Sequence, residues 1–133
     1  MICFKYEDIK DKALLSKLIK EEADRIFNSS IARRHRSYDI ISNNVKLGKT
    51  AEVWLYENFN YKFTNDIYTD LLTDRGNIIE VKVKRIKNLN CLNDQIQNDL
   101  EKIKSSNVNN STVYICFSYN DNIYKLEKII KLT

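Results

Sequence analysis

The chain has 133 residues, which is enough for a single domain with one hydrophobic core and too few for two. Apolar residues make up 43% of it and charged residues 30%, and no apolar run approaches the roughly 18 residues of a membrane span, so the composition is that of a globular protein rather than a membrane protein. The net charge of +4 permits nucleic-acid binding without requiring it.

The first predicted element is a long amphipathic helix over residues 6–27. Its apolar positions recur at helical spacing and form one stripe, while lysines and glutamates occupy the rest of the surface. Asn28 and the two serines after it are a plausible stop. We expect this helix to cover a sheet, and the alternative is a dimer seam. The stripe consists of Leu15, Leu18, Ile19, Ala23 and Ile26.

Residues 31–47 contain the densest basic cluster of the chain, Arg33, Arg34, His35 and Arg36. Guanidinium groups suit bidentate contacts to phosphate, so the three arginines are candidate DNA-binding residues. The alternative is a solvated turn between two helices. His35 fits a surface or phosphate-contacting histidine better than a catalytic base.

A second helix is predicted from Gly48 to about Phe59. Gly48, Glu52, Leu55 and Phe59 share one face by their spacing, so Glu52 points inward with apolar neighbours. A buried glutamate needs a partner, which makes Glu52 a candidate site residue. The alternative is an acid near a helix N-terminus that the helix dipole stabilises.

Residues 61–64 form a short predicted strand, and residues 67–73 and 78–83 form a hairpin around the turn residues Asp74, Arg75 and Gly76. A three-residue loop with Gly76 in the left-handed conformation pairs Thr73 with Asn77. The same register places Asp70 opposite Glu80, about 5 Å away. Two opposed carboxylates repel each other, and a cation between them removes that repulsion.

Alternation along the hairpin assigns its side chains to two faces. Ile79, Val81 and Val83 point into a core, while Glu80, Lys82 and Lys84 share the other face with Asp70. A two-residue loop would shift the register by one residue and send Asp70 to the wrong face. Asp66 is a competing acid whose register to Glu80 is worse.

The C-terminal part continues with a helix over residues 94–105, on which Ile96, Leu100 and Ile103 form the inner stripe. The strongly apolar run 112–119 is typical of a central parallel strand. Residues 123–132 fit either an amphipathic helix or an alternating edge strand, and periodicity leaves both open.

Asp70, followed after a short hairpin by Glu80, Val81 and Lys82, resembles the PD-(D/E)xK nuclease superfamily, whose pattern is an acid on one strand and acid-x-Lys on the next. Thr69 stands where the superfamily name has proline. A second acid-x-Lys triplet begins at Asp8, but it has helical context and no upstream acid on a strand.

The resemblance covers residues 48–119 and implies an α/β (α+β) fold. Its restriction endonuclease-like αβββαβ core has a mixed sheet flanked by helices, and the helix over residues 6–27 is an addition. It implies Mg²⁺, with Mn²⁺ as a substitute, held by Asp70, Glu80 and the Val81 carbonyl. Glu52 becomes an outer or second-metal acid, and Lys82 positions or activates the attacking water.

The same resemblance implies roles for further residues. Lys49, Lys84 and Arg85 join the arginine cluster as DNA-binding candidates. Gln95 corresponds to a glutamine found on this helix in several branches, the resolvase-like nucleases among them. Gln97 competes for that role, and the ordinary interpretation of either is a solvated helix residue.

The expected function is a Mg²⁺-dependent endodeoxyribonuclease that selects DNA by structure, of the junction-resolving or phage type. A small chain that cuts two strands acts most simply as a symmetric homodimer. A small restriction or homing endonuclease, a catalytically idle nucleic-acid-binding module and an RNA target remain alternatives. The three separated cysteines without a CxxC pair favour a reduced, cytoplasmic protein without zinc or disulfides.

Overall fold

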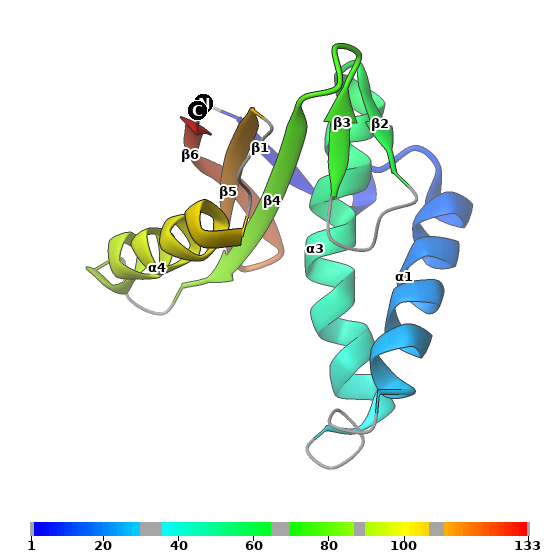
Figure 1. Cartoon of the computed structure of the whole chain (residues 1–133). Coiled ribbons are helices and arrows are strands. Elements are labelled where there is room, and N and C mark those ends of the chain that lie inside the picture. The colour runs from blue at the N-terminus through cyan, green and yellow to red at the C-terminus, as the bar shows by residue number, and fades with distance from the viewer. Residues whose placement is uncertain (1, 30–35, 65–69, 87–89, 107–110, 133) are drawn as a thin grey trace.

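The computed structural model of the chain describes residues 2–29, 36–64, 70–86, 90–106 and 111–132 (Figure 1). These residues form a mixed α/β structure with one six-stranded sheet in the order β1-β6-β5-β4-β3-β2. In chain order the elements are β1 (Cys3–Lys5), the 3-10 helix η1 (Tyr6–Asp8), α1 (Lys12–Phe27), α3 (Tyr38–Asn58), β2 (Tyr61–Phe63), β3 (Leu71–Thr73), β4 (Ile78–Arg85), α4 (Asn90–Ser106), β5 (Thr112–Asn120) and β6 (Ile123–Leu132).

The sheet is mixed because one pair of neighbouring strands is parallel. β4 and β5 run parallel along the whole of β4, from Ile78 opposite Thr112 to Arg85 opposite Tyr119. The pairs β2–β3, β3–β4, β5–β6 and β1–β6 are antiparallel. A parallel connection needs a crossover, and α4 supplies it between β4 and β5. The prediction of β5 as a central parallel strand is confirmed.

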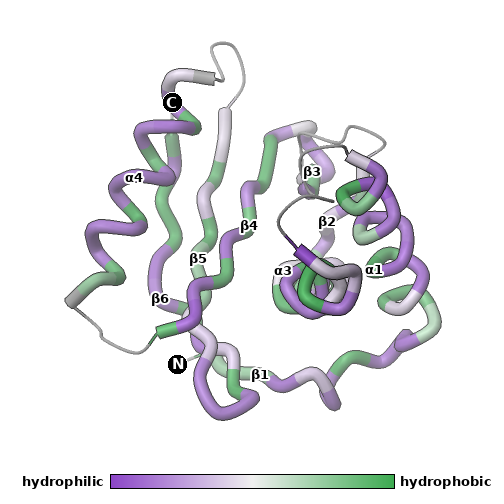
Figure 2. The backbone as a smooth tube through the Cα atoms, turned by 90° about the horizontal axis from the view of Figure 1, so that it is seen from below, coloured by the Kyte–Doolittle hydropathy of each residue, from purple (hydrophilic) through white to green (hydrophobic). Residues whose placement is uncertain are grey.

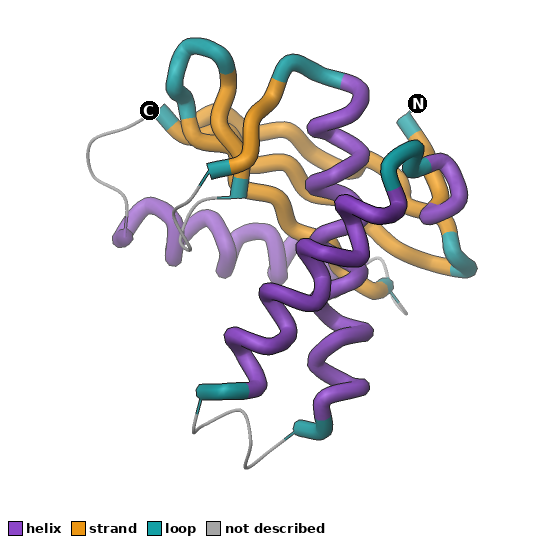
Figure 3. Tube along the Cα trace, turned by 90° about the vertical axis from the view of Figure 1, so that its right-hand side faces the viewer, coloured by secondary structure: helices purple, strands orange, loops and turns teal. Residues whose placement is uncertain are grey.

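Helices cover both faces of the sheet. α3, with α1 beside it, packs on one face, and α4 lies across the other (Figures 1 and 3). β5 is buried on both sides, so its side chains alternate between two cores: Ile115 and Phe117 face α3, and Tyr114 and Cys116 face α4. This double burial explains why the middle of the strand, residues 113–117, is apolar.

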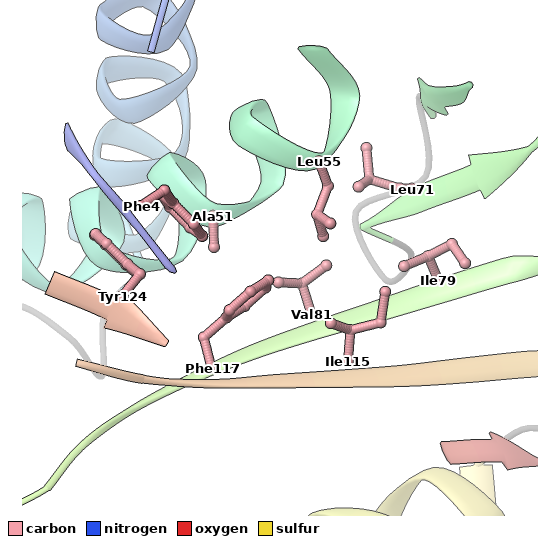
Figure 4. Close-up of a cluster of buried hydrophobic side chains, with 9 residues drawn as sticks. All are labelled: Phe4, Ala51, Leu55, Leu71, Ile79, Val81, Ile115, Phe117 and Tyr124. Carbon is pink, nitrogen blue, oxygen red and sulfur yellow. The ribbon is translucent and has the colours of Figure 1, made fainter. Parts of the chain in front are cut away.

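The larger core lies between α3 and the sheet, and Figure 4 shows its side chains converging from α3 and from strands of the sheet, β1 at the N-terminus among them. Leu71, Ile79 and Val81 enter it from the hairpin, as the predicted alternation requires. The buried members are Phe4, Ala51, Leu55, Leu71, Ile79, Val81, Ile115, Phe117 and Tyr124.

The hairpin has the predicted three-residue turn. The Gly76 N–H donates to the Thr73 carbonyl at 3.0 Å, and the Thr73 N–H donates to the Asn77 carbonyl at 2.9 Å. Gly76 has φ +83°, in the left-handed region. The ladder then pairs Leu72 with Ile78 and Leu71 with Ile79, which is the register expected from the turn.

The N-terminal half differs from the prediction at both helix starts. α1 begins at Lys12 rather than at residue 6, because residues 3–5 pair with β6 as a strand and the Asp11 side chain caps the helix by accepting from the Leu14 N–H at 2.9 Å. α3 begins at Tyr38 rather than at Gly48, and Ser37 is its N-cap. Gly48 therefore lies inside a helix instead of starting one.

The C-terminal half also resolves one open alternative. Residues 123–132 form the strand β6, and α4 begins at Asn90, four residues before the predicted start at residue 94.

Arg33, Arg34, His35 and Asp66 lie outside the described residues. Among the helices that the structure describes, none combines the length and the apolar character needed to cross a membrane.

Replacing Gly76 by alanine tests the turn. No atom lies within 4 Å of the position that the new Cβ would take, so the cost comes from the left-handed backbone alone. We expect Gly76→Ala to lower the free energy of unfolding by about 1–2 kcal/mol in urea denaturation. Gly76→Asn, which tolerates this conformation better, should recover part of the loss. Equal stability of wild type and Gly76→Ala would contradict the assigned turn.

Candidate functional site

Asp70 lies directly before β3, at the point where the ladder with β4 ends. Its Oδ2 accepts a hydrogen bond from the Val81 N–H at 2.8 Å, so the carboxylate lies against the edge of β4. Continuing the observed register by one residue puts Asp70 opposite Glu80. Burial raises the pKa of Asp70, while the Val81 N–H and the nearby Lys82 and Lys49 ammonium groups act to lower it.

Glu52 comes from the middle of α3 and is 5% exposed. Lys49, one turn earlier, lies with its Nζ 3.2 Å from Glu52 Oε1. The pKa of Glu52 is raised to about 8: burial raises it most, the charge of Asp70 also raises it, and Lys49 acts to lower it. Glu52 is therefore buried and Asp70 half-buried, and the two acids interact through their charges.

The structure thus brings acidic and basic side chains together from α1, α3, β4 and the residue directly before β3. Glu52 and Lys49 come from α3, Asp70 from the start of β3 and Lys82 from β4. Glu22 of α1 adds a further negative charge that raises the pKa values of both Glu52 and Asp70. The predicted DNA-binding residue Lys49 is here a partner of Glu52.

Glu22 is the site residue that the sequence did not reveal. It lies among the charged residues of α1 that the amphipathic pattern assigns to solvent, and it forms an ion pair with Arg25 on the same helix. Its proximity to the site follows from the packing of α1 beside α3, which helical spacing alone does not predict.

Glu80, Lys82 and Lys84 are half-buried and alternate along β4 with the core residues Ile79 and Val81. Lys84 lies toward α4, where its Nζ is 2.9 Å from Asp99 Oδ2. The Tyr114 hydroxyl donates to the same oxygen at 2.9 Å.

The charge of Lys84 is therefore already balanced on the α4 side. Gln95 is half-buried and Gln97 is exposed on that same helix, across the sheet from α3.

A groove of about 410 Å³ runs between α3 and the second half of β4. It exists because β3 pairs with only the first residues of β4, which leaves the following edge of β4 facing α3. Lys82, Lys84 and Arg85 line one side of the groove and Asn44 and Gly48 line the other.

Two contacts tie the sides of the groove to the site. Arg85 Nη1 donates to Asn44 Oδ1 at 3.1 Å, so a hydrogen bond links the two sides. A Cβ added at Gly48 would lie 3.9 Å from Glu52 Oε2, which places that carboxylate oxygen beside the groove wall. Arg36, exposed just before α3, is the described part of the predicted arginine cluster.

The carboxylate oxygens of Glu52 and Asp70 suit a hard cation that keeps several of its water ligands. Mg²⁺ is usually held by one or two carboxylates plus substrate phosphates rather than by a full protein cage. Lys49 occupies Glu52 Oε1 and the Val81 N–H occupies Asp70 Oδ2, so each acid has a second oxygen to offer. Within the described ranges, no group of three or more His, Cys, Asp or Glu side chains is arranged to hold a metal.

The buried acid pair predicts an unusual pH dependence for Glu52→Gln. Because the folded pKa of Glu52 is raised above the unfolded value, the folded state holds the extra proton, and ionisation costs stability as the pH rises toward 8. Glutamine removes that cost and can still accept from Lys49. We expect Glu52→Gln to raise the melting temperature in EDTA by several degrees at pH 9 and to change it little at pH 4.

Glu21→Gln, at an exposed position on α1, is the matched control and should change stability by less than about 0.5 kcal/mol at either pH. Thermal melts followed by circular dichroism give both values. An equal gain for Glu52→Gln at both pH values would mean that packing, and not ionisation, causes it.

Comparison of the chain with protein-family profiles, with curated proteins and with solved structures finds no match in any of the three. The likeness to the PD-(D/E)xK nucleases therefore rests on the chain's own residues: the hairpin register, the acids and lysine around it, and the helix that carries Glu52.

Proposed function

We propose that the chain is a metal-dependent nuclease that hydrolyses phosphodiester bonds in DNA. The observation that carries this proposal is the interacting pair of carboxylates, Glu52 buried and Asp70 half-buried, held beside Lys82 next to a groove with cationic residues along its β4 side. Burying two interacting acids costs folding free energy, so a role that needs both negative charges accounts for their position better than stability does.

Asp70, the Val81 carbonyl and Glu52 would hold the metal, which makes two acids rather than the three that the sequence predicts. In a strand, the N–H and C=O of one residue point to the same side, so the Val81 carbonyl points to the side from which Asp70 accepts the Val81 N–H. A bound Mg²⁺ or Mn²⁺ supplies Lewis acidity toward the phosphate and lowers the pKa of a coordinated water.

Lys82 would act on the substrate rather than on the fold. Its ammonium lies close enough to Asp70 to lower that pKa, and it lines the groove. From there it can orient the attacking water and stabilise the negative charge that develops on the scissile phosphate. Lys49 would balance Glu52 until a metal replaces that interaction.

The order of elements supports the same assignment. α3, β2, β3, β4, α4 and β5 follow one another as helix, three strands, helix and strand, which is the αβββαβ order that the resemblance implies. We therefore propose a restriction endonuclease-like core to which β1, α1 and β6 are additions. Selection of DNA by structure and action as a homodimer are parts of the same proposal.

A catalytically idle nucleic-acid-binding module is the competing function. The ion pair between Lys49 and Glu52 favours it, because a lysine already balances one of the two acids without any metal. Both proposals use the groove to bind the phosphate backbone, with Arg85 and Arg36 as contacts. The two differ in whether Asp70 and Glu52 bind a metal and whether Lys82 is needed for cleavage.

Cleavage of a DNA panel by wild type and Lys82→Ala tests the nuclease. The panel holds duplex, single strand, flap and four-way junction, each with Mg²⁺ or with EDTA. We expect Lys82→Ala to lose about 10²–10³-fold in cleavage rate, because it removes one preorganised charge at the transition state. Lys102→Ala, an exposed lysine on α4, is the control and should cut at the wild-type rate. Cutting by Lys82→Ala at the wild-type rate would place the site elsewhere.

Asp70→Asn tests the metal site without relying on activity. Isothermal titration of the free protein with Mn²⁺ should show weaker binding for Asp70→Asn, because one anionic ligand is lost. The variant should also melt at a higher temperature than wild type in EDTA at neutral pH, since asparagine removes a half-buried carboxylate that is costly to ionise. Wild-type protein that binds DNA but neither Mn²⁺ nor Mg²⁺ would favour the idle module.

A further inference from the structure

A second pocket lies at the end of the groove, on the side of the molecule where α3 begins. It has a volume of about 360 Å³, within the range of small-ligand sites. In Figure 2 the segment that joins β1 to α1 runs from the sheet past α3, and this segment closes one side of the pocket. Its lining includes Tyr6 of η1, Asn43 and Lys46 of α3, Arg85 at the end of β4, Tyr119 near the end of β5 and Asn122 in the turn that follows.

Aromatic rings form much of the pocket wall. Tyr6 and Tyr119 are half-buried, and Tyr124, 2% exposed, packs against Tyr119 with 4.9 Å between ring centroids. Lys46 Nζ lies over the Tyr6 ring at 4.2 Å from its centroid and Lys12 Nζ at 5.4 Å, so a base that stacks on this ring would take the place of an ammonium group. Nucleobases stack on aromatic faces largely independently of the base type, because every base has a π face.

The polar groups of the pocket match the edge of a base better than a phosphate. Asn43 and Asn122 carry amides, which both donate and accept, as the Watson–Crick edge of a base does. Glu7 adds an acceptor and would repel a phosphate placed here. Lys46 and Arg85 can contact the phosphates of a strand, while the two amides and Glu7 suit an uncharged heterocycle with donors and acceptors.

The turn that carries Asn122 holds its amide in place. Asp121 and Asn122 have φ values of 51° and 65°, in the left-handed region that asparagine and aspartate tolerate better than most residues. The Tyr119 hydroxyl donates to Asn122 Oδ1 at 3.0 Å. This contact orients both side chains before any ligand binds, which reduces the entropy lost on binding.

The pocket and the groove are adjacent, because Leu47 and Arg85 line both. The hydrogen bond from Arg85 to Asn44 spans the groove at this point, so a nucleic-acid strand that runs past Lys82 to the tyrosines would replace it. Arg85 can contact the phosphate at the junction, and Lys46 the phosphate that follows it. A base can enter the pocket only if it is not paired, because the Watson–Crick edge must be free to meet the amides.

We propose that this pocket receives an unpaired nucleobase of the nucleic acid whose backbone lies in the groove between α3 and β4. The substrate class is then a nucleic acid with a single-stranded end or a displaced nucleotide close to the cleavage point. This proposal rests on the proposed function, because the groove gives access to the pocket, and it adds the feature that the enzyme recognises.

Measuring DNA binding in EDTA, where no cleavage occurs, tests base recognition by the pocket independently of catalysis. Wild type is titrated by fluorescence anisotropy against a blunt duplex, the same duplex with a short overhang of either polarity, and the overhang duplex with abasic sites in the overhang. We expect about tenfold tighter binding of one overhang duplex than of the blunt one, the size of one base stacked on an aromatic ring. The abasic overhang keeps the phosphates and should lose this advantage.

Two variants remove the pocket's contacts while keeping its framework. Tyr6→Leu keeps an apolar side chain in the contact with the core under α1 and removes the ring, and Asn122→Gly keeps the left-handed turn and removes the amide. Both should bind the overhang duplex as weakly as the blunt duplex. Tyr56→Leu, at an exposed tyrosine on α3 that does not line the pocket, is the matched control and should retain the preference.

The outcomes distinguish this proposal from the proposed function. Metal-dependent cutting by wild type without any overhang preference would overturn the base pocket and leave the nuclease standing. An overhang preference that Tyr6→Leu abolishes, without cutting on any substrate, would support the pocket and overturn the nuclease. A preference kept by the abasic duplex would mean that phosphates are recognised and would overturn the pocket. Free deoxynucleoside monophosphates that bind as tightly as the overhang duplex would overturn the assignment to a nucleic-acid strand.

Discussion

The three-residue turn at Asp74, Arg75 and Gly76 determines where the other parts of the candidate site lie. With Gly76 at φ +83° the ladder pairs Leu71 with Ile79, and Val81 follows Ile79 into the core beneath α3. A hairpin register shifted by one residue would exchange the two faces of β3 relative to β4 and take Leu71 out of the core. The burial of the apolar hairpin side chains in the core therefore favours this register. The position of Asp70 against the edge of β4 follows from the register.

The carboxylate pair is the part of the structure that folding alone does not explain. Asp70 gains a backbone hydrogen bond and Glu52 gains Lys49, yet burial raises both pKa values, so both acids remain costly to ionise. A core made only for stability would place apolar side chains at these positions. At a pH below the raised pKa of about 8, Glu52 can hold the proton, which lowers the cost of the pair in the metal-free protein. A cation would replace that proton, so metal binding and proton release are linked here.

The sequence predicted local features better than long-range ones. The turn at Gly76 and the apolar strand β5 follow from residue chemistry within a few positions, and both were correct. β1 was missed because its three residues carry no strand pattern of their own and depend on pairing with the far end of the chain at β6. The start of α3 was placed too late because Gly48 suggests a boundary, whereas the Ser37 cap and the packing of the first turns against α1 outweigh the cost of one glycine inside the helix. Glu22 could not be foreseen, since only the packing of α1 beside α3 places it near Glu52.

The short hairpin also explains how a chain of this size can have a binding groove. If β3 were as long as β4, its backbone would pair with the whole edge of β4 and fill the space next to α3. Because the ladder stops at Leu71, the edge from Val81 to Arg85 borders a groove instead, and the side chains along it stay within reach of a ligand. An edge with free backbone groups invites pairing with another chain, and charged side chains such as Lys82 and Arg85 discourage it. The same residues that protect the edge also give the groove its positive charge, so protection against aggregation and attraction of a phosphate backbone have one physical origin.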